Sequence, residues 1–287
     1  MTNTVAIVTD TTACIQRKQL GEYGIEVVPV PLIFEDKAYL DGVDITPNEF
    51  YAFLRQAKKI PTTSGSSPNL YLEAYQRASR RASAILCVTE PRKFSGMYDS
   101  AQVAVEMAGK ALPKMVIEVL ECTTVAAGMG LVVLAAAKAA ASGENLIQVV
   151  EATKNIMRRV HLFATLDTLS YLVKGGRVPK AAALASSLLQ IKPIFTVNDG
   201  DAHSVTNVRT TPRAMKRILN IMEQTVTKWQ PLHVAVMHAD ALDRANVFSG
   251  QISSRFNCAE LFITEFSPVM GVHTGPGVIG VAFYSEE

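Results

Sequence analysis

Four stretches of the chain gather small and hydroxyl-bearing residues of the kind that bind an anion. They are residues 9–12 (TDTT), 62–67 (TTSGSS), 95–96 (SG) and 271–277 (GVHTGPG). Hydroxyl groups and free backbone N–H groups at helix starts bind carboxylates and phosphates. The chain has no GxxxxGK[S/T] phosphate loop and no GxGxxG dinucleotide motif. The pattern therefore predicts an anion site without a lysine-bearing loop, although each stretch alone is also explained by helix capping or a turn. In the first stretch Thr11 or Thr12 is the expected helix cap.

The stretch 271–277 is the most distinctive of the four. Three glycines and a proline constrain the backbone tightly around His273 and Thr274. Two interpretations stay open from the residues alone. Either the loop holds an imidazole at a chosen place, or it is a turn before the last strand that happens to contain a histidine.

Other reactive residues give weaker signals. Residues 172–177 are typical of a helix end, with Gly175 in the left-handed cap, so that a ligand contact by Arg177 is the less favoured interpretation. His233 and His238 lie five residues apart in an expected strand, point to opposite faces and predict no metal site. Cys14 follows a strand-end loop, where an inert buried thiol is favoured over a nucleophile.

These residues need elements that position them, and the first half of the chain alternates strand and helix. Thr46-Pro47 with Glu49 is a capping-box helix start. Alternation of this kind indicates a parallel α/β sheet, whose carboxyl edge lines a ligand crevice. We expect strands at 5–8, 25–30 (at a sheet edge, because of Pro29), 84–88 and 115–120, and helices from 46, 67, 95, 123 and 144.

The pattern changes after about residue 160. Strands are expected at 162–166, 193–197, 202–205, 234–237, 260–264 and 278–283, a hairpin turn at 198–201, and a helix from 211 to about 228. This half predicts an α+β arrangement with some antiparallel pairing. We therefore expect two domains, 1–160 (parallel α/β) and 161–287 (α+β), packed tightly because no Pro/Gly/Ser linker separates them.

Composition limits the classes of function. The chain has 287 residues, 48% hydrophobic and 19% charged, with a net charge of +2, which excludes intrinsic disorder and gives no electrostatic case for nucleic-acid binding. Four dispersed cysteines without a CxxC pair fit a reducing compartment. The start lacks a signal-peptide pattern, and the apolar run 125–137 is too short to span a membrane. We expect that run to be a buried helix and the protein to be soluble and cytoplasmic.

Taken together, these motifs resemble the DegV family of bacterial fatty-acid-binding proteins. The resemblance covers essentially the whole chain, and several blocks in one order are far more specific than any single block. The blocks are VTDTT (8–12), PTTS (61–64), SGMYDSA (95–101), LSYLVKGGR (169–177), KPI (192–194) with Asp199-Gly200, and GVHTGPG (271–277).

The resemblance implies a two-domain α/β fold that buries one fatty acid. It implies that the hydroxyls of Thr63 and Ser95 hold the carboxyl group, with the Gly96 amide and the His273-Thr274 stretch close by. It also implies that the bound acid is presented to a separate fatty acid kinase, which forms an acyl phosphate. On this basis the protein is a lipid carrier, with no catalytic residue, metal or cofactor of its own.

The chain departs from the family pattern in two places. Gly65-Ser66 stands where Gln-Pro is common after the second hydroxyl block, and Thr11-Thr12-Ala13-Cys14 departs from the usual first loop. Neither change removes a carboxyl ligand, but both can alter pocket shape or partner choice. The resemblance also places a basic kinase-docking surface around Arg209, where the motif is weak.

Two other functions remain open at this point. A small-molecule kinase or phosphotransferase subunit would share the hydroxyl-rich loops, but the missing Gly-Lys loop and the lack of a magnesium-binding carboxylate motif disfavour it. A DNA-binding regulator is disfavoured by the near-neutral charge and the lack of a basic recognition helix.

Overall fold

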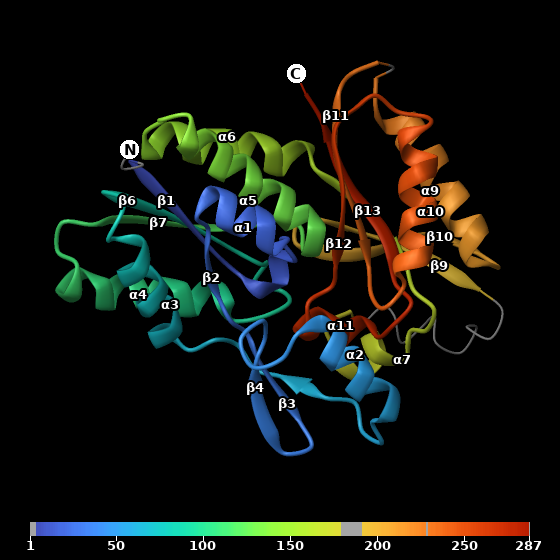
Figure 1. Ribbon diagram of the computed structural model, residues 1–287, viewed down its shortest axis with the longest axis horizontal. Coiled ribbons are helices and arrows are strands. Elements are labelled where there is room, and N and C mark those ends of the chain that lie inside the picture. The colour runs from blue at the N-terminus through green and yellow to red at the C-terminus, as the bar shows by residue number, and fades with distance from the viewer. Residues whose placement is uncertain (1–3, 179–190, 228, 287) are drawn as a thin grey trace.

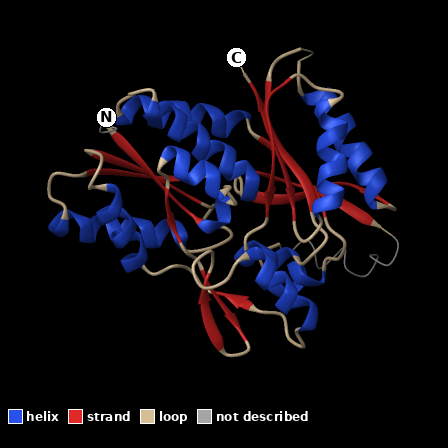
Figure 2. Ribbon diagram, in the orientation of Figure 1, coloured by secondary structure: helices blue, strands red, loops and turns tan. Residues whose placement is uncertain are grey.

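The computed structural model describes residues 4–178, 191–227 and 229–286. Its main body consists of alternating layers of helix and sheet (Figures 1 and 2). A parallel sheet and a mixed sheet stand on either side of a central pair of helices, and further helices cover the outer face of each sheet. The fold class expected from the sequence, a parallel α/β half beside an α+β half, is confirmed.

The first sheet has four parallel strands in the order β2-β1-β6-β7. Strands β1 and β6 are buried along their whole length, and β2 lies at the edge as Pro29 predicts. The strands are β1 (Val5–Asp10), β2 (Glu26–Val28), β6 (Ala84–Thr89) and β7 (Val116–Glu121); α3 (Pro68–Ala78) and α4 (Met97–Ala111) cover one face, and the short α1 (Arg17–Tyr23) packs on α5.

The central layer is formed by α5 (Ala126–Ala141) and α6 (Leu146–Arg159). Helix α5 packs on β1 of the first sheet and on β11 and β13 of the second. It consists mostly of Ala, Gly, Val and Leu and is buried on nearly every side. Small side chains let two sheets approach one helix closely, so the buried helix expected from the apolar run is confirmed.

The second sheet has six strands in the order β10-β9-β8-β13-β11-β12. Only β11 and β12 pair in parallel, and the other neighbours are antiparallel. The strands are β8 (His161–Thr165), β9 (Lys192–Asn198), β10 (Asp201–Val208), β11 (Leu232–His238), β12 (Cys258–Glu265) and β13 (Ile279–Ser285), with α9 (Thr211–Thr225) and α10 (Leu242–Ser253) on the outer face.

A small third group of elements closes one end of the molecule, at the bottom of Figure 1. In it α11 packs against α2, α7 and the strands β3 and β5. The sequence predicted α2 but not this three-stranded sheet. The members are η1 (Thr11–Ala13), β3 (Pro31–Phe34), β4 (Lys37–Leu40), α2 (Pro47–Gln56), β5 (Thr62–Thr63), α7 (Ser170–Gly175) and α11 (Pro268–Thr274).

Several local predictions are confirmed by backbone geometry. The Thr46 hydroxyl accepts from the Glu49 N–H, and the Glu49 carboxylate accepts from the Thr46 N–H, which completes the capping box. Asp199 and Gly200 both have positive φ between β9 and β10, as the expected hairpin turn requires.

Four local predictions need correction. In the first loop Asp10, rather than a threonine, is the cap, and it accepts from the Thr12 N–H. The left-handed residue after α7 is Gly176 instead of Gly175. The helix expected to reach Lys228 ends at Thr225, and Lys228 itself lies outside the described residues. Residues 271–274, expected in a tight loop, belong to α11, because Ser267-Pro268 starts a helix there.

Within the described ranges, no helix has the length and apolar character needed to cross a membrane. The strands of the parallel sheet fall within residues 5–121 and those of the six-stranded sheet within 161–285. The domain division near residue 160 stays a prediction.

Candidate functional site

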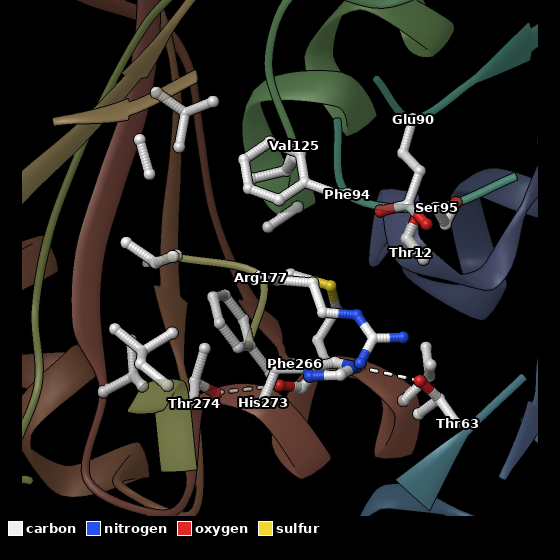
Figure 3. Close-up of a pocket in the computed structure, with 18 of the residues that line it drawn as sticks. Thr12, Thr63, Glu90, Phe94, Ser95, Val125, Arg177, Phe266, His273 and Thr274 are labelled. Carbon is white, nitrogen blue, oxygen red and sulfur yellow. Dashed lines mark hydrogen bonds between the residues drawn. The ribbon is translucent and has the colours of Figure 1, made fainter. Parts of the chain in front are cut away.

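A cavity lies between the two sheets, at the end where η1, β5, α7 and α11 meet (Figure 3). Its larger part is apolar and comes from β8, β9, β11 and the start of α5. Its polar residues gather on the side of the first sheet and α11. The apolar lining includes Val125, Leu162, Ala164, Leu166, Phe195, Val197, Met237, Phe266 and Val278, and the polar lining includes Thr12, Thr63, Ser64, Glu90, Ser95, Arg177, His273 and Thr274.

Thr63 and His273 form the most specific contact in this lining. The Thr63 hydroxyl oxygen lies 2.9 Å from Nε2 of His273, and the dashed line in Figure 3 marks this bond. Thr63 lies on β5, and His273 lies on the last turn of α11. Two residues that the sequence predicted separately are therefore brought into direct contact.

Burial keeps the His273 imidazole neutral. Desolvation, with Arg177 as a second cause, lowers the pKa of His273 to about 4. The other ring nitrogen, Nδ1, is buried without a hydrogen-bond partner and faces Gly175, where a β-carbon would lie 2.6 Å from it. An unpaired lone pair is tolerated at such a place better than an unpaired N–H, so the proton belongs on Nε2. In that tautomer Nε2–H donates to Thr63, whose own O–H is free to donate into the cavity.

The neighbouring residues around these two have different roles. The Thr274 hydroxyl lines the cavity but donates to the Met270 carbonyl one turn back, at 2.9 Å. Ser95 lines the cavity, and its Oγ accepts from the Met97 N–H at 3.3 Å, at the start of α4. Gly96 is the N-cap of α4 and is not among the residues that line the cavity. Thr63, Ser95 and His273 are thus brought to one cavity, whereas Gly96 lies outside its lining.

Glu90 adds a buried carboxyl group that the sequence reasoning missed. It directly follows β6, is 7% exposed and lines the cavity beside Ser95 and Thr12 (Figure 3). Burial first, and then the charge of Asp10, raise the pKa of Glu90 to about 8. An acidic residue directly after a largely apolar strand, 84–89, was the signal available in the sequence.

The two arginines of interest lie in different places. Arg177 is exposed and lines the cavity, and its Nη1 donates to the Gly175 carbonyl at 2.7 Å. Arg209 is exposed between β10 and α9 and is not part of the cavity lining. Of these two arginines, only Arg177 lies where it could contact a ligand in the cavity.

The remaining candidates have structural partners. The two ring nitrogens of His233 lie 3.0 Å from carboxylate oxygens of Glu260 and Glu286. Burial raises the pKa of Cys14 to about 12, so its thiol stays protonated at neutral pH. Within residues 4–178, 191–227 and 229–286 no three His, Cys, Asp or Glu side chains are grouped to hold a metal ion.

Comparison with known proteins agrees with this architecture. A DegV domain-containing protein of Caldanaerobacter subterraneus is 31% identical over 279 residues, which is 97% of this chain and 98% of that protein. The solved structure of a DegV family protein from Thermus thermophilus, described as fatty acid binding, has a TM-score of 0.90 and 26% identity and covers 98% of this chain and 99% of that one. A stearic-acid-binding protein from Eubacterium ventriosum has a TM-score of 0.88 at 23% identity, with 98% of each chain covered.

The family model described as "Uncharacterised protein, DegV family" matches residues 4–286. The match spans both sheets and every polar residue of the cavity lining. This chain therefore belongs to the DegV family.

Proposed function

We propose that the protein binds a long-chain fatty acid in this cavity and presents its carboxyl group to a separate fatty acid kinase. The observation that carries the proposal is the distribution of polar and apolar residues in the lining. An apolar space between the sheets leads to the polar Thr63–His273 pair. An amphipathic ligand with one small acidic head group matches that division. The Thermus thermophilus relative, described as fatty acid binding, supports the same ligand class.

The energetics of such a ligand are favourable. A chain of about 16 carbons buries about 14 methylenes, which contribute on the order of 11 kcal/mol before costs. Immobilising the ligand and ordering its chain costs several kcal/mol. Affinity then comes mainly from the apolar part, and the hydroxyls of Thr63 and Ser95 fix the head group. Because neutral donors hold the carboxylate less firmly than a bidentate arginine would, its oxygen stays available to attack a phosphoryl group.

The proposed kinase step rests on the family resemblance and on the lack of a phosphate-binding loop in the sequence. The sequence has no phosphate loop, so ATP would be bound by the partner. On this account the protein is a carrier rather than an enzyme, Arg209 belongs to the docking surface, and the place of action is the cytoplasm. The four cysteines are free thiols, which fits that compartment.

Two experiments test the proposal in order. Titration with a fluorescent fatty acid should give saturable binding that stearic acid displaces, and no binding would contradict the carrier function. A purified fatty acid kinase with ATP should then form acyl phosphate, trapped as the hydroxamate, only when this protein is present. Equal product without it would contradict the presenting role while leaving lipid binding intact.

A further inference from the structure

Glu90 is an acidic residue in the polar lining of the cavity, and the proposed binding of the head group by hydroxyls gives it no role. Its carboxyl group lies next to Ser95 and Thr12 in Figure 3, on the polar side of the lining. A carboxylate there would repel the carboxylate of a bound fatty acid. The repulsion would be strong because bulk water, which weakens interactions between charges, is largely excluded from the cavity. The protonation state of Glu90 therefore decides whether this end of the cavity accepts an acidic head group.

The surroundings favour the protonated form. Asp10, at the end of β1, is 1% exposed and accepts from the Thr12 N–H at 2.9 Å and from the Thr12 hydroxyl. Burial raises the pKa of Asp10 to about 6, and the two bonds from Thr12 act against that rise. Because the pKa of Glu90 is raised further, to about 8, Asp10 ionises first and the proton of the pair resides on Glu90. Other ionisable groups lie around this strand end. Arg177 favours the charged form of Glu90, and His273 is neutral. The others are Tyr71 on α3, Glu121 at the end of β7, and Cys122, whose N–H donates to the Thr89 carbonyl and whose thiol burial keeps protonated.

Hydrogen-bond capacity at Ser95 links Glu90 to the ligand. A serine hydroxyl has one hydrogen to donate and two lone pairs that accept. One lone pair already accepts from the Met97 N–H, and the Glu90 carboxyl group lies beside Ser95 (Figure 3), where a hydrogen bond from the Ser95 hydroxyl favours the charged form of Glu90 and lowers its pKa. An ionised Glu90 consumes the single Ser95 hydrogen. A protonated Glu90 donates to the remaining lone pair, which leaves the Ser95 O–H free for a ligand carboxylate.

We propose that Glu90 is a positioning residue that must carry a proton for the fatty acid carboxylate to bind at Ser95. The inference rests on the proposed function and deepens it. When Glu90 is ionised in the free protein, ligand binding takes up one proton from solution, and that proton resides on the Glu90 carboxyl. No bond other than the O–H bond forms or breaks.

The sign of the pH dependence follows from this linkage. Below about pH 8, where the buried Glu90 is already protonated, binding takes up no proton there and the affinity is constant. Above that pH each bound ligand must be accompanied by a proton. Affinity should then fall by up to tenfold for each pH unit.

The test compares stearic acid affinity of the wild type, Glu90→Gln and Glu121→Gln between about pH 6.5 and pH 9.5, by displacement of a fluorescent fatty acid. The glutamine amide donates to Ser95 at every pH, so Glu90→Gln should bind with a flat profile. Glu121→Gln removes a nearby carboxylate that does not line the cavity and should keep the wild-type profile. Because all variants are measured with the same ligand, the ionisation of stearic acid itself affects every affinity profile equally.

A second measurement needs no variant. Calorimetry of the wild type at about pH 9, in two buffers of different ionisation enthalpy, should report uptake approaching one proton per ligand and almost none at about pH 6.5. Binding without uptake at high pH, or a Glu90→Gln profile that parallels the wild type, would overturn this inference alone. Failure of the wild type to bind stearic acid at any pH would overturn the proposed function and this inference with it.

Discussion

The Thr63 hydroxyl and Nε2 of His273 lie 2.9 Å apart although 210 residues separate them in the chain. The contact joins β5, in the first half, to α11, in the second. It therefore depends on the docking of α11 against β3 and β5. Any change that moves α11 should alter head-group binding even if it never touches the ligand.

Removing the Thr63 hydroxyl should weaken fatty acid binding with the fold intact. Thr63→Val keeps the side-chain shape but loses the donor, and Ser95→Ala loses the second one. Each should reduce affinity by about ten- to a hundredfold, since one hydrogen bond to a charged group is worth roughly 1.5–3 kcal/mol. Fluorescent fatty acid titration measures the change, and circular dichroism checks the fold.

The neighbouring Thr62 provides the matched control. It lies on the same strand, is exposed and does not line the cavity, so Thr62→Val should bind as the wild type does. Unchanged affinity in the double variant of Thr63 and Ser95 would reject the head-group assignment.

His273 should matter more for acyl transfer than for binding. His273→Ala leaves the apolar lining nearly complete, so most of the binding free energy remains. Without the imidazole the Thr63 hydroxyl can rotate, and a carboxylate held in the wrong orientation reacts poorly. A coupled kinase assay beside the titration measures both effects. An equal loss in the two assays would argue against a separate role for His273.

Gly175 should be intolerant of a side chain because it supports His273. Its φ is not positive, so alanine creates no backbone strain there, but the new β-carbon would lie 2.6 Å from Nδ1 of His273. We expect Gly175→Ala to displace the imidazole and, like His273→Ala, to reduce acyl transfer more than fatty acid binding. Gly109→Ala on α4 meets no atom within 4 Å and should behave as the wild type. Equal acyl-transfer rates for the two variants would mean that the imidazole position does not matter.

Asp41 should make the protein less stable as the pH rises. It is 1% exposed, and its Oδ2 accepts from the Val269 N–H at 3.1 Å, at the start of the helix that carries His273. Burial raises the pKa of Asp41 from 3.8 to about 7. The unfolded chain therefore releases this proton first, and the contribution of Asp41 to stability falls as pH rises from about 4 through 7.

Asp41→Asn keeps an acceptor oxygen but cannot ionise. Urea unfolding should show its free energy of unfolding rising relative to the wild type between about pH 4.5 and pH 8. Asp44→Asn serves as the control, because Asp44 is exposed in the same turn, where it accepts from the Leu40 N–H. If the free energies of unfolding of the wild type and Asp41→Asn differed by the same amount at every pH in this range, Asp41 would already be ionised in the folded protein.

Local signals explain what the sequence could predict. The capping box at Thr46 and Glu49 and the hairpin turn at Asp199 and Gly200 depend on neighbouring residues only, and both are present. The tight loop expected at 271–277 is wrong for residues 271–274, because Ser267-Pro268 starts a helix that reaches Thr274. Residues 275–277 do form a turn, with Gly275 and Gly277 at positive φ. The small sheet of β3, β4 and β5 lacks a regular alternation of buried and exposed residues, so no periodic signal marked it.

Part of the site was predicted, but from the family resemblance rather than from local sequence signals. Family resemblance named Thr63, Ser95 and His273, which line one cavity, but no local pattern could show that α11 brings His273 onto β5. Glu90 was missed because a single acidic residue after a strand is an ordinary surface feature. In the folded protein it lies in the lining of the cavity between the two sheets and is 7% exposed.

The most direct test of the central claim is mass spectrometry of an organic extract of the purified protein, recorded beside its native mass. The account predicts a long-chain fatty acid at about one molecule per chain, or stoichiometric uptake of added stearic acid by protein that was purified empty. A protein that is purified empty and takes up no added fatty acid would contradict the lipid-carrier function.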